Sequence, residues 1–545
     1  MKAHNNGQPK SLRQQAKDAG IPWSTFRRNN KTAEQNTTVE KPRVRVQALS
    51  IAIPEIIQKP SKSERPLLGG SLEGPEARVK KANGRRWVIT SAQNNTRIFD
   101  SFFKAILGFC DHNGAELLVA GFSYNKNAFE NPHQQTKASE DLWYDEAIQP
   151  FLVNAPTRLA KDLVFCGELD ILPTAVDPMS GLDSYTKSSS GIIPHAKIAM
   201  KSMAVMKGQH ARFLYTTGAC TQLNYIQRKA GQKAEFHHVF GAIYVEVDES
   251  GDWFCRQLIA GSDGSFYDLD KHYSACGISR ARVEAITWGD FHEEKRDTQV
   301  LNACFDSEHS ILESLRPREQ HVHDLADFTA RNHHNRGSAY FLAQTHFSGG
   351  ASVRDGMKSC ADKLQSIERS WCRTVVVESN HDQAFRRWLE EADGHRDPIN
   401  ASYWHRWNLR MFEAIEAGVE PLIFEEAVRS STKSKLQNTT FLREDDSWVI
   451  CADQGDGIEC GMHGHRGPNG SRGSPKSYRQ IGRRCNTAHT HSCGIVDGIY
   501  TAGVSGSLDM GYNKGPSSWS HSHIITYPNG KRAILTMRGK KWRAT

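Results

Sequence analysis

The strongest constraint on the fold is a run of β-branched residues that ends in a polar triplet. Val375, Val376 and Val377 predict a buried strand, and Asn380-His381-Asp382 follows where that strand should end. In an α/β sheet, residues that bind ligands or do chemistry collect at the carboxyl ends of strands. Asn offers a neutral oxygen ligand, His a proton, and Asp a carboxylate that can orient the His. A lone triplet of this kind is more often a plain polar loop, so its meaning depends on its partners.

Four further groups of ligand-type residues follow predicted strands or lie near them. In chain order they are Asp290 and His292, Asp324 and Asp327, His463 and His465, and His489 and His491. An Asp-x-His at a strand end can direct a carboxylate and an imidazole at one cation, and a carboxylate can bridge two cations. Of the 24 histidines, 16 lie from His292 onward, so this half of the chain is where metal chemistry is expected.

The order of these five groups resembles that of the calcineurin-like metallophosphoesterases. That family's motifs include Gly-Asp-x-x-Asp, Gly-Asn-His-Asp or -Glu, and Gly-His-x-His; here His323, Ser379 and Ala488 replace the leading glycines. The resemblance implies an α/β fold with a four-layer β-sandwich flanked by helices over residues 281–545. It also implies a two-metal site that hydrolyses phosphoesters.

The resemblance assigns a role to each residue of the motifs. It implies one cation held by Asp290, His292 and His491, a second held by Asn380, His463 and His489, and Asp324 as the bridge between them. Asp327 stays open as an alternative bridge, and His465 as an alternative to His463. His381 would face the phosphate as a general acid or electrostatic stabiliser, with Asp382 orienting it. A mixed oxygen and nitrogen set without thiolates favours two divalent ions, Mn²⁺ first, with Fe or Zn as substitutes in vitro.

The net charge of the chain is unevenly distributed. The whole chain carries +8, and residues 1–80 account for all of it with 15 Lys and Arg against 7 Asp and Glu. Residues 1–30 resemble a helix-turn-helix arm in which Arg27 and Arg28 would contact DNA, although an amphipathic hairpin fits equally well. Residues 31–80, rich in Pro, Lys, Ser and Gly, read as a basic linker. Such an arm is attracted to polyanions, although a solvated tail would show the same charge.

Residues 81–280 predict a separate α/β domain whose function the sequence leaves open. A strand over 87–90, a helix over 99–110 and a strand over 116–121 form a β-α-β unit, which favours a partly parallel sheet. Later strands are expected over 163–166, 242–247 and 253–258, the last two as a hairpin. There is no phosphate-binding loop and no dinucleotide fingerprint.

DNA is the predicted substrate of the two-metal site. A loop rich in Gly and Arg lies between the fourth and fifth groups and offers Arg466, Arg472, Arg483 and Arg484 to the phosphates. With Leu172-Pro173-Thr174 and Thr216-Thr217-Gly218 in the region before the five groups, the full length also resembles T5-type bacteriophage pre-early DNA-transfer proteins. This resemblance implies a Mn²⁺-dependent DNase that degrades host DNA and assembles as a homo-oligomer. The alternatives are a phosphatase or cyclic-nucleotide phosphodiesterase, and a non-enzymatic DNA-binding or transfer protein.

The composition predicts a cytosolic protein, in the host bacterial cytoplasm if a phage encodes it. Mean hydropathy is −0.58, no apolar run approaches the length of a membrane span, and the N-terminus lacks an apolar signal core. The twelve cysteines are scattered without a Cys-x-x-Cys pair, which favours reduced, structural thiols.

Overall fold

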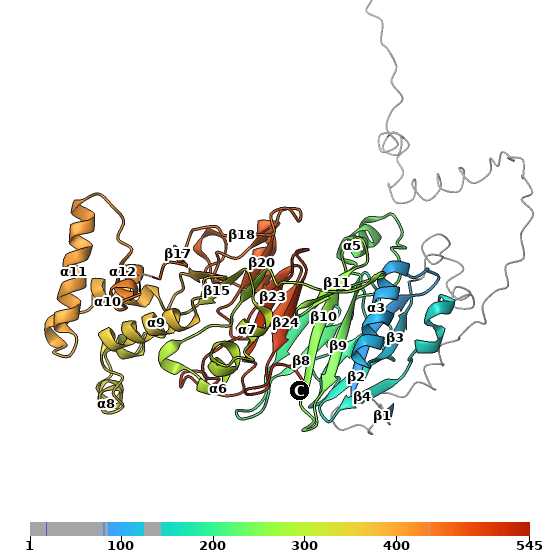
Figure 1. Ribbon diagram of the computed structural model, residues 1–545, viewed down its shortest axis with the longest axis horizontal. Coiled ribbons are helices and arrows are strands. Elements are labelled where there is room, and N and C mark those ends of the chain that lie inside the picture. The colour runs from blue at the N-terminus through green and yellow to red at the C-terminus, as the bar shows by residue number, and fades with distance from the viewer. Residues whose placement is uncertain (1–17, 19–79, 82–84, 125–142, 435, 545) are drawn as a thin grey trace, which may run out of the picture. The chain divides into compact units, whose positions relative to one another are not determined.

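The computed structural model describes residues 18, 80–81, 85–124, 143–434 and 436–544 (Figure 1). The predicted arm over 1–30 with Arg27 and Arg28, and the linker over 31–80, lie outside the described residues except for Asp18 and Lys80. The elements described below lie in one compact unit, Glu55–Thr545. Among the described residues, none of the helices combines the length and apolar character needed to cross a membrane.

A six-stranded sheet carries three of the five polar groups singled out by the sequence, those that follow β14, β15 and β16. Its strands lie in the order β17-β16-β15-β14-β23-β24. Their bounds are β14 Ala285–Thr287, β15 Glu319–His323, β16 Arg373–Val377, β17 Thr439–Leu442, β23 Ser522–Thr526 and β24 Arg532–Thr536. Strands β14 to β17 are mutually parallel, whereas β23 runs antiparallel to β14 and forms a hairpin with β24. The four parallel strands therefore end at one edge.

An eleven-stranded sheet joins distant parts of the chain, in the order β1-β4-β5-β6-β8-β7-β21-β22-β20-β19-β18. Its earlier strands are β1 Lys80–Lys81, β4 Pro156–Ala160, β5 Leu163–Cys166, β6 Ser190–Ile193, β7 Met200–Met203 and β8 Arg212–Thr216. Its later strands are β18 Val449–Ile450, β19 Ile458–Glu459, β20 Arg484–Thr487, β21 Gly494–Val496 and β22 Ile499–Thr501. Because β7 pairs with β21, the predicted division at residue 280 does not separate two sheets; the division itself stays a prediction.

Two smaller sheets complete the strands. One has the order β10-β9-β2-β3, with β2 Arg86–Gln93, β3 Glu116–Phe122, β9 Gly241–Val247 and β10 Trp253–Ile259; the other has the order β11-β12-β13, with β11 Phe266–Asp268, β12 Lys271–Ser274 and β13 Gly277–Arg280. The predicted β-α-β unit is confirmed, because β2 and β3 are parallel and α3 connects them. The predicted hairpin of β9 and β10 is confirmed as well.

Helices fill the connections between strands. The α-helices are α3 Asp100–Asn113, α5 Lys229–His237, α6 Thr298–Leu301, α7 Ile311–Leu315, α8 Ala339–Phe347, α9 Val353–Ile367, α10 Gln383–Glu391, α11 Ala401–Glu416, α12 Ile423–Ser430 and α13 Pro475–Tyr478. The short helical turns are η2 Glu146–Phe151, η3 Glu293–Lys295, η4 Asn302–Asp306, η5 Thr329–Arg331, η6 Gly394–Arg396, η7 Pro468–Gly470 and η8 Arg479–Ile481. Helices α9 to α12 gather beside the β17 edge (Figure 1).

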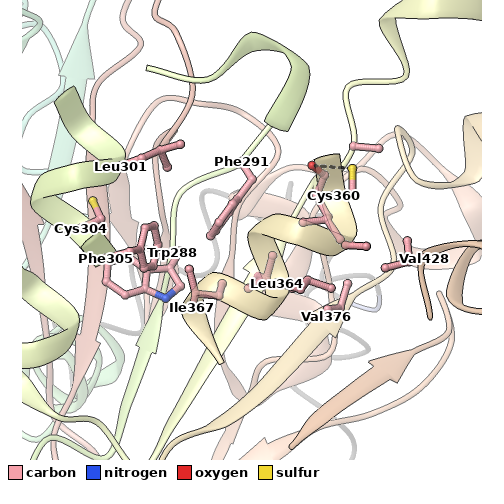
Figure 2. Packing of buried hydrophobic residues seen from close by; sticks show 14 of the residues in the cluster. Trp288, Phe291, Leu301, Cys304, Phe305, Cys360, Leu364, Ile367, Val376 and Val428 are labelled. Atoms are coloured by element: carbon pink, nitrogen blue, oxygen red, sulfur yellow. Dashed lines mark hydrogen bonds between the residues drawn. The ribbon is translucent and has the colours of Figure 1, made fainter. Parts of the chain in front are cut away.

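The core beside the six-stranded sheet follows from helical spacing. Helix α9 buries Val353, Met357, Cys360, Leu364 and Ile367 along one stripe, and Ser352 caps its N-terminus. Figure 2 shows this stripe facing aromatic residues that follow β14 and the strand β16. Each fully buried Leu or Ile side chain contributes about 1.5–3 kcal/mol by leaving water. This packing fixes the strand ends from which the polar groups project.

Two coarse predictions are confirmed. The chain is a mixed α/β protein with several sheets and many helices. All twelve cysteines are free and most are buried, as expected for reduced, structural thiols. The finer four-layer arrangement stays a prediction.

Candidate metal centre

The carboxyl ends of the parallel strands bring the predicted motifs together. Asp290 and His292 follow β14, and Asp324 follows β15 directly. The two loops are joined by a backbone hydrogen bond in which the His292 N–H donates to the Asp324 carbonyl at 2.7 Å. Asp290 is tied to a third segment, because its Oδ2 accepts the backbone N–H of His489 at 2.9 Å. Backbone bonds therefore hold three motifs at one place.

One group of four buried side chains lies at this edge: Asp290, His292, Asp324 and His491. Each offers one ligand atom, and these atoms lie within 4.8 Å of one another. Asp290 Oδ2 is 3.1 Å from His491 Nε2, and Asp324 Oδ2 is 3.4 Å from His292 Nε2. The two Nε2 atoms of His292 and His491 are only 3.0 Å apart. Two imidazole lone pairs repel at that distance unless a proton or a cation lies between them.

A second group shares Asp324 with the first. It consists of Asp324, His463 and His489, with His463 Nε2 at 3.3 Å from Asp324 Oδ2. Asn380 follows β16, and within the described part of the chain its buried Oδ1 has no hydrogen-bond partner. Asp324 is thus the carboxylate common to both groups, the position predicted for a bridging ligand. Asp327, the alternative bridge, belongs instead to a third group with His292 and His381.

The donor atoms of both groups fit divalent cations. Asp290 Oδ1, Asp324 Oδ1, Asn380 Oδ1 and both ring nitrogens of His463 are buried and make no hydrogen bond among the described residues. Buried polar atoms without partners are costly, and they are rare in native proteins unless a water or an ion satisfies them. Carboxylate, amide and imidazole donors without thiolates are the set that Mn²⁺ and related ions accept.

The backbone at this centre is strained. His292, Asp324, His489 and His491 all have positive φ angles, between 45° and 71°. Residues other than Gly adopt this left-handed region at a cost, which is smaller for Asn, Asp and His, and residues held there cluster at functional sites. The strain turns each side chain toward a shared point, as a preorganised ligand set requires.

His381 lies beside the two groups and belongs to neither. Its Nδ1 is 3.0 Å from the backbone carbonyl oxygen of Asp327 and 3.8 Å from the Asp327 carboxylate. Asp382, predicted to orient His381, bonds elsewhere: it accepts the Ala326 N–H at 3.1 Å and the Ser379 hydroxyl at 2.8 Å. Asp327 therefore takes the orienting position, and Asp382 ties the β15 loop to the β16 loop.

The structure also distinguishes His463 from His465. His463 is fully buried against Asp324, whereas His465 Nε2 lies 2.8 Å from the Glu444 carboxylate. Gly464 between them has a φ of +127°, which turns the two imidazoles to different neighbours. His463 is the residue that joins the ligand cluster.

The charged side chains of the centre shift one another's pKa values. Burial opposes ionisation of Asp324, but His463, His381 and His292 together hold its pKa well below the usual range. Burial lowers the pKa of His292 and of His463, but attraction to Asp324 raises each to about 9. Without a cation, these imidazoles are therefore protonated at neutral pH, and the protons occupy positions that a cation would take.

The four predicted DNA-contacting arginines of the Gly/Arg loop have different surroundings. Arg466 pairs with Glu444 at 2.7 Å and lines a pocket of about 390 Å³ together with His463 and His465. Arg472 is exposed, and Arg483 is half-buried at 3.8 Å from Glu459. Arg484 donates to the backbone carbonyls of Gly530 and Gln454. Arg484 therefore secures the β23–β24 turn, while Arg466 is the one that shares a pocket with the centre.

Several residues of the centre carry no sequence signal that would have identified them. His323 replaces a family glycine, and its ring packs 5.6 Å from that of His463. Trp519 stacks edge-on against His491 at 4.1 Å, and Tyr512 in turn contacts Trp519 at 5.9 Å. The replacement of the family glycine by His323 was visible in the sequence, but nothing in the spacing of Trp519 and Tyr512 pointed to the centre.

Fold and site together define a class: a mixed α/β protein with a buried cluster of histidines and carboxylates able to hold metal ions. The chain is 40% identical over 491 residues to Protein A1 of Escherichia phage T5, a match that covers 88% of this chain and 86% of that relative. The chain therefore belongs to the family of phage T5 Protein A1, which fits a role in phage infection. No family model and no solved structure matches it.

Proposed function

We propose that the protein is a metal-dependent DNase that hydrolyses phosphodiester bonds of host DNA during phage infection. The observation that carries the proposal is the pair of ligand groups that share Asp324, with His381 beside them but outside both. This is the division of labour that two-metal hydrolysis needs. The parallel order of β14 to β17 supports extending the proposal to the four-layer fold of the calcineurin-like metallophosphoesterases.

Two cations would be held by the residues of the two groups. Asp290, His292 and His491 would hold the first, Asn380, His463 and His489 the second, and Asp324 would bridge them. Mn²⁺ fits the donor set best. When bound, such a pair supplies Lewis-acid chemistry: it activates water and neutralises charge on the phosphate. The protein's contribution is a rigid, buried ligand set whose strained backbone is already in place.

His381 would act on the departing oxygen of the DNA strand. Its Nδ1 is engaged by the Asp327 carbonyl, which leaves Nε2 to face a substrate. A protonated imidazole there can donate its proton to the leaving oxygen, or stabilise the negative charge that develops on it. The Asp327 carboxylate, 3.0 Å from His292 Nδ1, would orient a ligand and the acid together.

DNA is the substrate class that the surroundings favour. Arg466 shares a pocket with His463, and residues 1–80 carry the whole net positive charge of the chain. Both features attract phosphates. A phosphatase or cyclic-nucleotide phosphodiesterase, or a DNA-transfer protein without catalysis, would share the centre but not the requirement for polymeric DNA.

The test is loss of plasmid DNA on incubation with the purified protein and Mn²⁺. We expect degradation that chelator abolishes, and Asp324→Asn should abolish it because the shared ligand is lost. Asp362→Asn, at an exposed carboxylate paired with Lys358, is the matched control and should keep full activity. Degradation that persists in chelator or in Asp324→Asn would refute the metal mechanism. Hydrolysis confined to p-nitrophenyl phosphate or cyclic nucleotides would refute the DNase assignment.

We also propose that the protein self-associates through helix α11. Leu409, Phe412 and Ile415 form an apolar stripe there, each about 60% exposed. Basic Arg406 lies toward the N-terminal end of this stripe and acidic Glu416 at its C-terminal end. In an antiparallel pair of α11 helices related by a two-fold axis, opposite charges would face each other across the buried stripe.

A further inference from the structure

A pocket of about 350 Å³ opens beside His381 and Asp327. It continues into a larger cavity of about 870 Å³, because Lys295, Thr329, Asn335, Phe341, Met510 and Tyr512 line both. We call the combined space the Tyr512 groove. The groove leads away from the reacting centre past η5, α8 and the loop over 509–514, and nothing in the two-metal chemistry requires it.

Tyr512 forms a fixed aromatic wall of the groove. Its hydroxyl lies 3.0 Å from Met510 Sδ, and its ring contacts Trp519, which in turn packs on His491. The loop is held by Asn513 Oδ1, which accepts the Met510 N–H at 3.1 Å. The Tyr512 side chain nevertheless stays 52% exposed. An anchored aromatic ring with a free face is a stacking platform for a nucleobase.

Lys295 supplies a cation to the same wall. Its backbone is fixed on both sides: its N–H donates to the His292 carbonyl at 2.6 Å, and its carbonyl accepts the Ser507 N–H at 2.7 Å. The residue is half-buried and lines both cavities. A lysine whose backbone is fixed in this groove, three residues from His292, can offer its ammonium to a phosphate.

The amides of Asn332 and Asn335 complete the pocket that adjoins His381. An Asn amide both donates and accepts hydrogen bonds, so it can read the edge of any base. Aromatic wall, cation and amides thus lie in one groove that ends at the proposed general acid.

We propose that the Tyr512 groove binds an unpaired DNA strand, with one base stacked on Tyr512 and a neighbouring phosphate on Lys295. The inference rests on the DNase function proposed for the same centre and adds that the strand enters unpaired. A pocket of about 350 Å³ lies at the small end of the range for small-molecule sites. The pocket beside His381 suits a single nucleotide, and stacking on an aromatic ring requires a base that has left its own stack.

Binding without turnover is the first test. Fluorescence anisotropy in chelator would compare a single-stranded 12-mer with a duplex of the same sequence. Tyr512→Ala should bind the single strand about tenfold more weakly than wild type, because one stacked base is lost. Tyr512→Phe keeps the aromatic ring and should bind nearly as well as wild type. Lys295→Ala should weaken it and flatten its salt dependence. Tyr340→Ala, at a 92% exposed tyrosine on α8 that lines neither cavity, is the matched control. Equal losses for duplex and single strand, or no loss, would overturn the inference.

Cleavage with Mn²⁺ separates this inference from the function on which it rests. If the wild-type protein hydrolyses neither oligonucleotides nor bis(p-nitrophenyl) phosphate, the proposed function is refuted, and the groove assignment is refuted with it. Wild-type protein that cleaves DNA, while Tyr512→Ala keeps the same ratio of single-strand to duplex kcat/KM, would remove the groove assignment alone. We expect that ratio to fall about tenfold in Tyr512→Ala.

Discussion

At the scale of single residues, His381 differs from the histidines around it in the group that its ring contacts. His292 and His463 lie within 3.4 Å of an Asp324 carboxylate oxygen, whereas the shortest contact of His381 is to a backbone carbonyl of the β15 loop, with the Asp327 carboxylate at 3.8 Å. Its removal should therefore leave the ligand groups intact. We expect His381→Asn to lower kcat on DNA by about 10²–10⁴-fold, which is the usual contribution of a general acid. The affinity for Mn²⁺ should stay unchanged.

The control for His381→Asn is His309→Asn, at a histidine whose side chain is 85% exposed and belongs to none of the three groups. Steady-state kinetics and Mn²⁺ titrations of both variants measure kcat and metal affinity separately. Weakened Mn²⁺ binding in His381→Asn would make this histidine a ligand instead of an acid.

The pKa values of His292 and His463 predict how pH acts on the metal-free protein. Each is raised from about 6.5 to about 9 by Asp324, in spite of burial. A raised folded-state pKa contributes stability that is fully present below pH 6.5 and is lost as pH rises toward 9. Metal-free protein should therefore melt at lower temperature at pH 9 than at pH 6.5.

Metal binding should reverse this trend, because cations must displace the same protons. Calorimetric Mn²⁺ titrations at pH 7, in buffers of different ionisation enthalpy, should show net proton release and an affinity that increases with pH up to about 9. Proton uptake, or an affinity independent of pH, would contradict the assignment of His292 and His463 as ligands.

At the scale of elements, the turn at Gly464 positions two motifs against each other. Its φ is +127°, and a Cβ there would lie 3.0 Å from the Ala488 carbonyl oxygen and 3.2 Å from His489 Cβ. Gly464→Ala should therefore cost about 1–3 kcal/mol of unfolding free energy and displace His463 from Asp324. Denaturant melts and Mn²⁺ titration measure both effects.

Gly108→Ala provides the matched control for that change. Gly108 lies inside α3, has no positive φ, and a Cβ there would meet no atom within 4 Å. The substitution should leave the free energy of unfolding unchanged or raise it slightly, since Ala favours helices. A Gly464→Ala variant as stable and as metal-competent as this control would show that the turn is not strained.

Much at this scale is predictable from sequence, and the reason is geometric. Parallel strands end at one edge, so polar residues after β14, β15 and β16 had to meet there. The partner of Asp382 was not predictable, because side-chain direction beyond a strand end depends on loop φ angles. The positive φ of Asp324 and the turn at Gly464 decide these directions, and neither leaves a mark in residue spacing.

At the scale of the whole molecule, the exposed stripe on α11 predicts an assembly. Phe412→Glu places a like charge beside Glu413 and Glu416 on a surface that would otherwise be buried in a pair. We expect it to lower the mass measured by light scattering to that of the monomer, with unfolding free energy within about 0.5 kcal/mol of wild type, as for surface changes generally.

Phe347→Glu is the comparison for that experiment, because Phe347 on α8 is 88% exposed and lies outside the stripe. It should leave the measured mass unchanged. A wild-type protein that is already monomeric, or a Phe412→Glu variant of unchanged mass, would rule out pairing through α11.

The pairing of β7 with β21 also bears on when the cluster of histidines and carboxylates can assemble as the chain is made. Nearly 300 residues separate these neighbours, and β20 to β22 come from the last eighth of the chain. His489 and His491 leave the ribosome with those strands, well after Asp290 and His292. Long-range pairing of this kind is slow to form. An incomplete chain therefore lacks one histidine from each group, so the cluster cannot assemble until nearly the whole protein has been synthesised.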